Sequence, residues 1–525
     1  MALKFPLPRI HSVFGKTDQS PKPHSRVRSI PAGAQISGDL DLRGYSWLRS
    51  IGADVRISGS LRLGGAAPET TQTQKKEASK PRQSHLTVLP DGLQVGGDLH
   101  LRSCSQLETL PPSLRVRGNL TLRGLRRLRE IPPGVFAGNR LEIVGCPKLT
   151  RLPSILTPLQ FLMIDGVGIE SLPDDLEMAP DAEIVIQNCS RLRSLPEALL
   201  AGGNLRRIVI RNCPALGSLP NLIARWLIVL ERLRLQEISS RLQAVRVRVS
   251  HCQSLSSIDG AISAEHLELS QCPTLARFPT PETALSSLNL RGCKSLPALP
   301  QRLRFVGSNQ TTAKLIVRDC AALKTLPAEL SLTQSPVQAE LQLLVEGSGL
   351  KSIPNYEFLC RIQCRGVWLE PRLYFATETI EPAEIFGHWN AEVRRILLER
   401  ASIENVLSRM EHQVIDEDAD PGGPRRLILI RLSNDSWITP EWAPRNPGGF
   451  RRAFERLLPG LSKRSARNAA AFPRPGTATF LHCRCPSTGR QYLLPVPPTI
   501  RSCKAAAAWM AGFDKPEDYQ PELET

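Results

Sequence analysis

One phrase of about 21 residues recurs along this chain at a fixed period. The copy that opens at Leu89 reads LPDGLQVGGDLHLRSCSQLET, and later copies open at Leu110, Ile131 and Leu152, each 21 residues after the one before. A unit of this length forms one coil, which can bury its apolar face only against its neighbours. The period therefore predicts a stack of coils, a solenoid, rather than a domain with one central core.

The repeats fill the chain from residue 30 to residue 354, in about fourteen coils of uneven length. The stretch from Leu219 to Ser257 contains two degenerate copies. A polar insertion at residues 65–84, which begins GAAPETTQTQKK, interrupts one coil; it has almost nothing to bury, so we expect it to be mobile. The repeats thus predict one long solenoid that occupies most of the chain.

Each copy contains a short segment in which apolar and polar residues alternate. In the copy that opens at Leu89, Leu99 and Leu101 alternate with His100 and Arg102, which is the period of a strand with one buried face. Stacked in parallel, such strands make a ladder on the order of 65 Å long. The other side of each coil carries Leu-Pro or Ile-Pro, and because proline disfavours helix we expect that side to be extended.

The pattern L-x-L-x-x-[N/C]-x-x-L within each copy resembles leucine-rich repeats. Eight of the thirteen cysteines occupy one position of this pattern, five residues after the first apolar strand residue. In leucine-rich repeats that position points inward, so the resemblance implies buried packing thiols rather than disulfides or metal ligands. A chain with many unpaired thiols is expected in a reducing compartment. The eight residues are Cys104, Cys146, Cys189, Cys213, Cys252, Cys272, Cys293 and Cys320.

The last position of each L-x-L-x segment is expected to face the concave side of the solenoid. Arginine recurs there, and because its guanidinium binds carboxylates and phosphates through paired hydrogen bonds, the column favours an acidic partner. A merely solvated face is the alternative. Val144 and Ile164 are expected to add an exposed apolar patch, as in many protein interfaces. The arginines are Arg43, Arg102, Arg123, Arg211, Arg291 and Arg318, with Gln187, Gln236, Ser250 and Ser270 between them.

Residues 355–525 lack the repeat and are expected to form a separate small α+β domain. Apolar residues at helical spacing predict a helix over residues 390–413. The acidic run at residues 416–420 and the following Pro421-Gly422-Gly423 are expected to form an exposed turn before the strand RRLILIRL. The chain should end in strand, turn, strand and a helix capped by Ser502. The fold class is therefore α/β: a leucine-rich repeat solenoid followed by a small α+β domain.

Cysteine and histidine side chains outside the repeats are the remaining candidates for chemistry. Cys483 and Cys485 flank Arg484, but C-x-C is a poor match to the spacing of structural zinc ligands. His482 and Cys483 are neighbours in an expected strand, so they should point to opposite faces and not act as a pair. Phosphate-loop, zincin and nucleophile-elbow motifs are absent. We therefore expect no catalytic residue, no metal site and no cofactor.

The net charge of +17 includes two basic segments outside the repeats. Residues 1–29 carry a single acid among several lysines and arginines, and are expected to be disordered, either as a solvated tail or as a secretion leader. Residues 445–467 are also strongly basic, which makes nucleic-acid binding an alternative function. No apolar run is long enough for a membrane span or a Sec signal peptide.

The short repeats punctuated by Leu-Pro resemble the bacterial leucine-rich repeat class found among type III secreted effectors, and the residues from Cys485 onward resemble the end of an uncharacterised bacterial domain that often accompanies them. The resemblance implies a non-catalytic scaffold that recognises an acidic host protein through its concave face after secretion into the host cytosol. Some members of the class carry a ubiquitin ligase domain with a C-x-D motif, which this chain lacks. A ligase of another type, or a protein that stays in the bacterial cytoplasm, are the alternatives.

Overall fold

The chain divides into two compact units, Met1–Leu359 and Cys360–Thr525. The predicted N-terminal tail apart from its last two residues, nearly all of the insertion at residues 65–84, and the basic segment 445–467 lie outside the described residues. The computed structural model describes residues 28–43, 45, 48–65, 86–135, 138–153, 158–307, 312–333, 340–386, 391–419, 426–432, 478–484, 491–497, 499–510 and 517.

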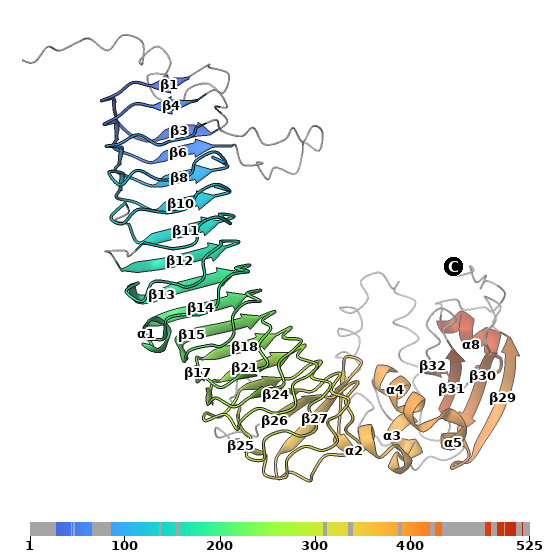
Figure 1. Ribbon diagram of the computed structural model, residues 1–525. Helices are drawn as coiled ribbons and strands as arrows, with labels where there is room; N and C mark the ends of the chain where they lie inside the picture. Colours follow the sequence, from blue (N-terminus) through green and yellow to red (C-terminus); the bar gives the residue numbers. More distant parts are fainter. Residues whose placement is uncertain are drawn as a thin grey trace, which may run out of the picture. The chain divides into compact units, whose positions relative to one another are not determined.

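The first unit is a solenoid of parallel strands, as predicted (Figure 1). Each coil contributes one strand to a continuous ladder, and the register places equivalent positions of neighbouring coils side by side, so that Leu99 lies opposite Leu120 and Leu120 opposite Leu141. The ladder strands are β3 (Leu40–Arg43), β6 (Leu61–Gly64), β8 (Leu99–Arg102), β10 (Leu120–Arg123), β11 (Arg140–Val144), β12 (Leu159–Asp165), β13 (Met178–Gln187), β14 (Leu205–Arg211), β15 (Leu222–Glu231), β18 (Arg246–Ser250), β21 (His266–Ser270), β22 (Ser287–Asn289), β24 (Ala313–Ile316) and β26 (Glu340–Leu344).

The side of each coil away from the ladder is mostly extended, which confirms the expectation from the Leu-Pro pairs. The one helix among the described residues of this unit is α1 (Glu197–Ala201). Short parallel strands join neighbouring coils on this side: a sheet of β2 (Gln35–Ile36), β5 (Arg56–Ile57), β7 (Gln94–Val95) and β9 (Arg115–Val116), and the pairs β1 (Ser29–Ile30) with β4 (Ser50–Ile51), β16 (Glu237–Ile238) with β19 (Ser257–Ile258), β17 (Leu242–Gln243) with β20 (Ile262–Ser263), and β23 (Arg304–Val306) with β25 (Ser331–Thr333).

The eight repeat cysteines are all buried and carry no disulfide, so the predicted packing role is confirmed. Several of their thiols donate hydrogen bonds to backbone carbonyls of the preceding coil, as from Cys293 Sγ to Leu269 O at 2.8 Å and from Cys320 Sγ to Leu290 O at 3.0 Å. Burial raises the pKa of Cys293 to about 12 and that of Cys320 to about 11. These two thiols therefore stay protonated at neutral pH and keep the proton that they donate to the preceding coil.

The residue before each of these inward bend positions has a left-handed backbone. Gly124 has a φ of +69°, Asn188 of +55° and Asn212 of +48°. Glycine adopts this conformation without strain, and asparagine does so more readily than other side chains. The left-handed conformation is therefore a backbone requirement of the coil. Gly and Asn meet it with the least strain, and Ser103, His251, Gln271 and Asp319 adopt it in other coils.

Replacing Gly124 with valine is expected to lower the free energy of unfolding by about 1–2 kcal/mol. The cost is conformational, because a Cβ atom at Gly124 would meet nothing closer than 3.7 Å. Gly124→Asn is the matched control and should cost less, since asparagine occupies the same position in two other coils. Chemical denaturation compares the two variants; an equal loss from valine and asparagine would contradict the conformational explanation.

The second unit contains a four-stranded antiparallel sheet in the order β29 (His412–Ala419), β30 (Arg426–Leu432), β31 (Ala478–Arg484) and β32 (Gln491–Val496). Ile430 and Phe480 pack with buried residues of α3 (Pro382–Phe386), α4 (Ala391–Ala401) and α5 (Ile403–Leu407). The alternate strand residues Leu429 and Leu481 pack with Ala506 of α8 (Cys503–Met510). Helices therefore cover both faces of the sheet, which confirms the α+β expectation. The division between the two units falls within β27 (Leu359–Cys364), which β28 (Val367–Leu369) and α2 (Pro371–Phe375) follow.

Two local predictions for this unit are wrong. The expected helix over residues 390–413 is broken at Ser402, whose φ is +63°, and its last residues belong to β29. Residues 416–419 of the acidic run are not part of a turn, because they lie within β29, where Asp416 Oδ2 accepts a hydrogen bond from the Cys503 N–H at 2.6 Å. Residues 420–423 of the predicted turn lie outside the described residues. Local spacing in the sequence does not show that residues 412–419 pair with β30 as a strand at the edge of the sheet. The final helix is confirmed, and Ser502 Oγ accepts a hydrogen bond from Ala505 N at 3.2 Å, as a cap does.

Candidate protein-binding face

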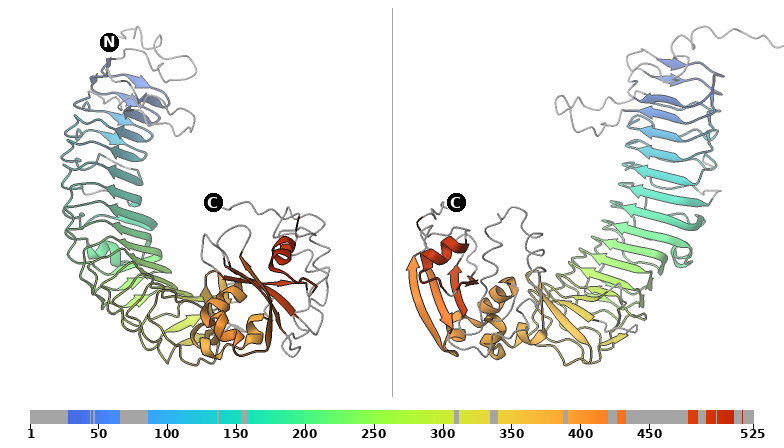
Figure 2. Two further views of the ribbon diagram at one scale, coloured as in Figure 1. Left: turned by 90° about the vertical axis from the view of Figure 1, so that its right-hand side faces the viewer. Right: turned by 180° about the vertical axis from the view of Figure 1, so that it is seen from behind.

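The ladder strands lie on the inner side of the curved solenoid, so their outward side chains form its concave face (Figure 2). The strand alternation decides which side chains these are. In β8, Leu99 and Leu101 are fully buried, whereas His100 and Arg102 are partly exposed. The position three residues after the first inward residue, here called the arginine column, thus faces outward as expected.

The structure places seven of the eight predicted binding residues in the arginine column. The register of the ladder aligns those that lie within paired strands. Arg291 and Arg318 follow the ends of their strands, where a backbone hydrogen bond from the Gly292 N–H to Arg318 O, at 2.9 Å, continues the same alignment. Other members of the column are Gly64, Asp165, Glu231 and Glu346. The seven are Arg43, Arg102, Arg123, Val144, Arg211, Arg291 and Arg318.

Two residues were assigned to this column in the wrong register. Ile164 is fully buried and pairs with Ile143, whereas Asp165 pairs with Val144 and takes the outward position. The expected patch of Val144 with Ile164 is therefore wrong, because a slip of one residue moves a strand's side chains to the other face. Gln236 lies outside the ladder, and Glu231 of β15 holds the position, opposite Arg211 and Ser250. Asp165 and Glu231 thus place carboxylates at positions where the neutral side chains of Ile164 and Gln236 were expected.

Most of the arginine column is neutralised within the solenoid. Although burial raises the pKa of Glu142, hydrogen bonds from Arg123 and Arg140 lower it below its ordinary value overall. Among the described residues, Arg102 alone in the column has no carboxylate within ion-pair distance. The ion pairs are Arg43 with Asp41 at 2.6 Å, Arg123 with Glu142 at 2.9 Å, Arg211 with Glu231 at 3.1 Å, Arg291 with Asp319 at 3.5 Å, and Arg318 with Glu346 at 3.2 Å. Charge alone therefore does not make this face a site for an acidic partner.

Four apolar side chains occupy adjacent strands at the middle of the concave face. They stand at the position between the two inward residues of β12, β13, β14 and β15, and the register places them side by side. We call this set the apolar strip. Val209 and Val229 are almost completely covered, whereas Met163 and Val185 are partly exposed. The strip was not predicted from the sequence, although the residue type between the two inward residues of each strand indicates it. Its members are Met163, Val185, Val209 and Val229.

Polar and charged groups border the apolar strip on both sides. On one side, Gln187 Nε2 donates a hydrogen bond to Asp165 Oδ2 at 2.9 Å, and Arg211 pairs with Glu231. On the other side, Arg207 lies 3.6 Å from Glu183. These pairs hold long side chains in place beside the strip, so the strip has a polar rim.

The cysteines that the structure describes in the second unit are mostly buried. Cys360, Cys364 and Cys503 are buried, and burial raises the pKa of Cys503 to about 12. Cys483 is partly buried and packs against a hydrophobic cluster, and Cys485 lies outside the described residues. Within the described ranges, no three His, Cys, Asp or Glu side chains converge in a way that holds a metal ion.

No protein-family model matches the chain, and a search of curated proteins finds no significant match. The class of the protein is therefore given by its fold alone. It is a repeat solenoid of parallel strands, compatible with a leucine-rich repeat protein, joined to a small unit of strands and helices.

In the part of the chain that the structure describes, no helix is both long and apolar enough to cross a membrane.

Proposed function

We propose that this protein is a non-catalytic recognition scaffold that binds a protein partner on the concave face of its solenoid. The apolar strip carries the proposal. It lies on four adjacent strands held in one register, with ion pairs and polar side chains on both sides of it. An apolar centre with a polar rim is a common composition of protein interfaces, and contacts near such centres supply most of the binding energy.

The chemistry of the face suggests the chemistry of the partner. An apolar ridge would cover Met163 and Val185, where apolar surface is still exposed. A carboxylate of the partner would pair with Arg102, for which the described part of the chain provides no ion pair. The resemblance to bacterial effectors supports the further proposal that the partner is a host protein met after secretion.

Replacing Val185 with aspartate is expected to weaken partner binding by at least about 2 kcal/mol, or about thirtyfold in Kd, because a charge at the strip loses its water on binding. Val88→Asp is the matched control: it adds the same charge at a residue that is 62% exposed and outside the ladder strands. Proteins captured from a eukaryotic lysate by the wild type are identified and expressed, and their Kd for each variant is then measured.

Circular dichroism should show that both variants keep the wild-type content of strand. A partner that binds the Val185→Asp and Val88→Asp variants equally well would not use the strip. If that held for all captured proteins, the concave face would not be the recognition surface.

A further inference from the structure

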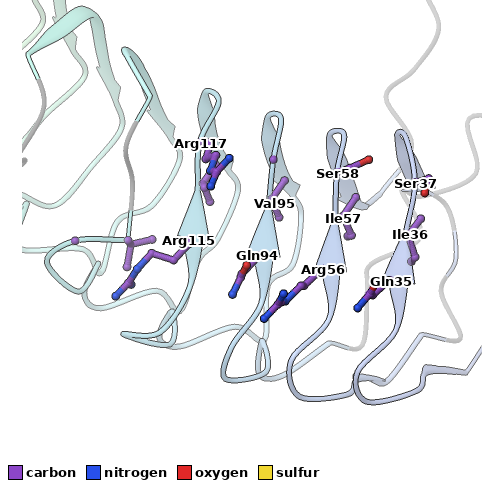
Figure 3. A pocket seen from close by; sticks show the side chains of 14 residues that line it. Gln35, Ile36, Ser37, Arg56, Ile57, Ser58, Gln94, Val95, Arg115 and Arg117 are labelled. Atoms are coloured by element: carbon purple, nitrogen blue, oxygen red, sulfur yellow. The ribbon is translucent and has the colours of Figure 1, made fainter. Parts of the chain in front are cut away.

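A second surface of the solenoid differs from the concave face in the balance of its charges. The sheet β2–β5–β7–β9 and the residues just beyond it line an open groove of about 670 Å³ (Figure 3). The lining comes from five successive coils and ends at Gly134 and Val135. Ile57, Val95 and Val116 are buried beneath it, so the polar residues on either side of them form the surface.

Two rows of exposed side chains cross these coils. The first row alternates glutamine and arginine, because the register pairs Gln35 with Arg56, Arg56 with Gln94, and Gln94 with Arg115. Figure 3 shows these four side chains at the same level of successive coils, pointing the same way. The second row, two residues further along each coil, contains Ser37, Ser58, Gly96 and Arg117.

The positive charge of the groove is not neutralised by the described residues. The lining contains three arginines and no carboxylate. Arg56 and Arg117 are exposed and have no carboxylate within ion-pair distance in the described part of the chain. Arg115 donates from Nη1 to Pro112 O at 2.8 Å and to Leu114 O at 3.0 Å, which orients its guanidinium and leaves the charge uncompensated.

Two carboxylates near the ends of these strands are already engaged. Asp91 Oδ1 accepts a hydrogen bond from Ser113 Oγ at 2.9 Å. Asp98 Oδ1 accepts one from the Asn119 N–H at 2.7 Å. These bonds tie the acids to the turns between coils and not to the arginines of the groove. The groove thus has three arginines without an ion pair among the described residues, whereas in the arginine column this holds for Arg102 alone.

We propose that this groove binds an extended acidic peptide segment of a partner protein. The forked guanidinium groups suit carboxylates, and the glutamine and serine side chains add hydrogen bonds for a peptide backbone. Four intervals between coils span about 19 Å, which is the length of about six extended residues. The lining has no aromatic side chain, whereas single-stranded nucleic acids are held largely by stacking on aromatic rings. An acidic peptide therefore fits the groove better than a nucleic acid.

The test measures fluorescence anisotropy of a fluorescein-labelled hexaglutamate peptide with the full-length protein. Replacing Arg56, Arg115 and Arg117 together with alanine should weaken binding roughly tenfold, and added salt should weaken binding to the wild type. The matched control removes three arginines from the concave face that do not border the apolar strip, Arg43, Arg291 and Arg318, and should change the Kd less than twofold. A second variant, Arg56→Ala with Arg117→Ala, leaves the carbonyl bonds of Arg115 in place and should show an intermediate loss.

Three outcomes would overturn the proposal. The triple groove variant could bind hexaglutamate as tightly as the wild type, or the concave control could lose as much affinity as the groove variant, which would indicate general attraction to a basic protein. The third is that hexauridylate RNA binds more tightly than hexaglutamate and loses as much affinity in the groove variant, in which case the ligand is a nucleic acid.

Discussion

Replacing Gly260 with alanine is expected to lower the free energy of unfolding of the solenoid by about 3 kcal/mol. A Cβ atom at Gly260 would lie 1.9 Å from Ser240 O and 2.4 Å from Ser240 C, and both are backbone atoms of the preceding coil. Backbone atoms held in a stack of coils cannot rotate away as the end of a side chain can. The two coils would therefore have to separate.

The clash falls on the contact between two coils, so it should also change how the solenoid unfolds. Stability in repeat proteins is close to a sum of coil terms and nearest-neighbour terms, and weakening one contact uncouples the two parts of the stack. Denaturant unfolding should show a lower midpoint and a shallower transition for Gly260→Ala. Hydrogen exchange should locate the loss of protection around the contact between the two coils.

Gly217→Ala is the matched control for this prediction. Gly217 has no atom within 4 Å of the position its Cβ would take, and its φ lies outside the left-handed range. The variant should be as stable as the wild type, or slightly more stable because alanine reduces the entropy of the unfolded chain. Equal midpoints for Gly260→Ala and Gly217→Ala would show that the coils are not stacked as tightly as described.

Neutralising Glu392 and Glu399 together as glutamines is expected to destabilise the second unit by about 3 kcal/mol. Both carboxylates pair with Arg395, whose side chain is fully buried in α4. Arg395 Nε donates to Glu392 Oε2 at 2.8 Å, and Nη1 donates to Glu399 Oε1 at 2.6 Å. These hydrogen bonds raise the pKa of Arg395, so the double variant leaves a charged guanidinium without compensation away from water.

Adding Arg395→Met to the double variant separates the cost of the buried charge from that of packing. Methionine has a similar length and no charge, so most of the lost stability should return. Glu381→Gln serves as a surface control: it removes a partner of Arg409 at 3.1 Å, with the Glu381 side chain 66% exposed, and should cost less than about 1 kcal/mol. Thermal unfolding monitored by circular dichroism compares the stability of the variants. A triple variant no more stable than the double variant would contradict the buried-charge explanation.

Much of the solenoid could be predicted from the repeat itself. A period of 21 residues, two inward leucines and a cysteine at a fixed offset describe one coil almost completely, because each coil has the same backbone and contacts only its neighbours. The small unit after the repeats was predicted less well. Its helix ends at Ser402 and its acidic strand pairs with β30, and both features depend on partners far away in the sequence.

The candidate binding face was predicted in part. The arginine column was found because its position recurs in every coil and arginine occupies it in several of them. Ile164 and Gln236, however, were assigned to it by a local match to L-x-L-x. In β12, several apolar residues follow one another, so the local pattern allows two registers. The parallel pairing of Val144 with Asp165 selects one of them.

By itself, the sequence determined that this protein is a solenoid, where its inward residues recur and that arginine lines its concave face, since these follow from a local period. The tertiary structure alone decided which charges meet. Carboxylates from neighbouring strands or coils pair with most of the arginine column, four apolar side chains align into one strip, and Arg56, Arg115 and Arg117 gather in a groove without an acid. The physical reason is that stacking brings residues about twenty positions apart to within about 5 Å, and one sequence read in a line does not show which of them become neighbours.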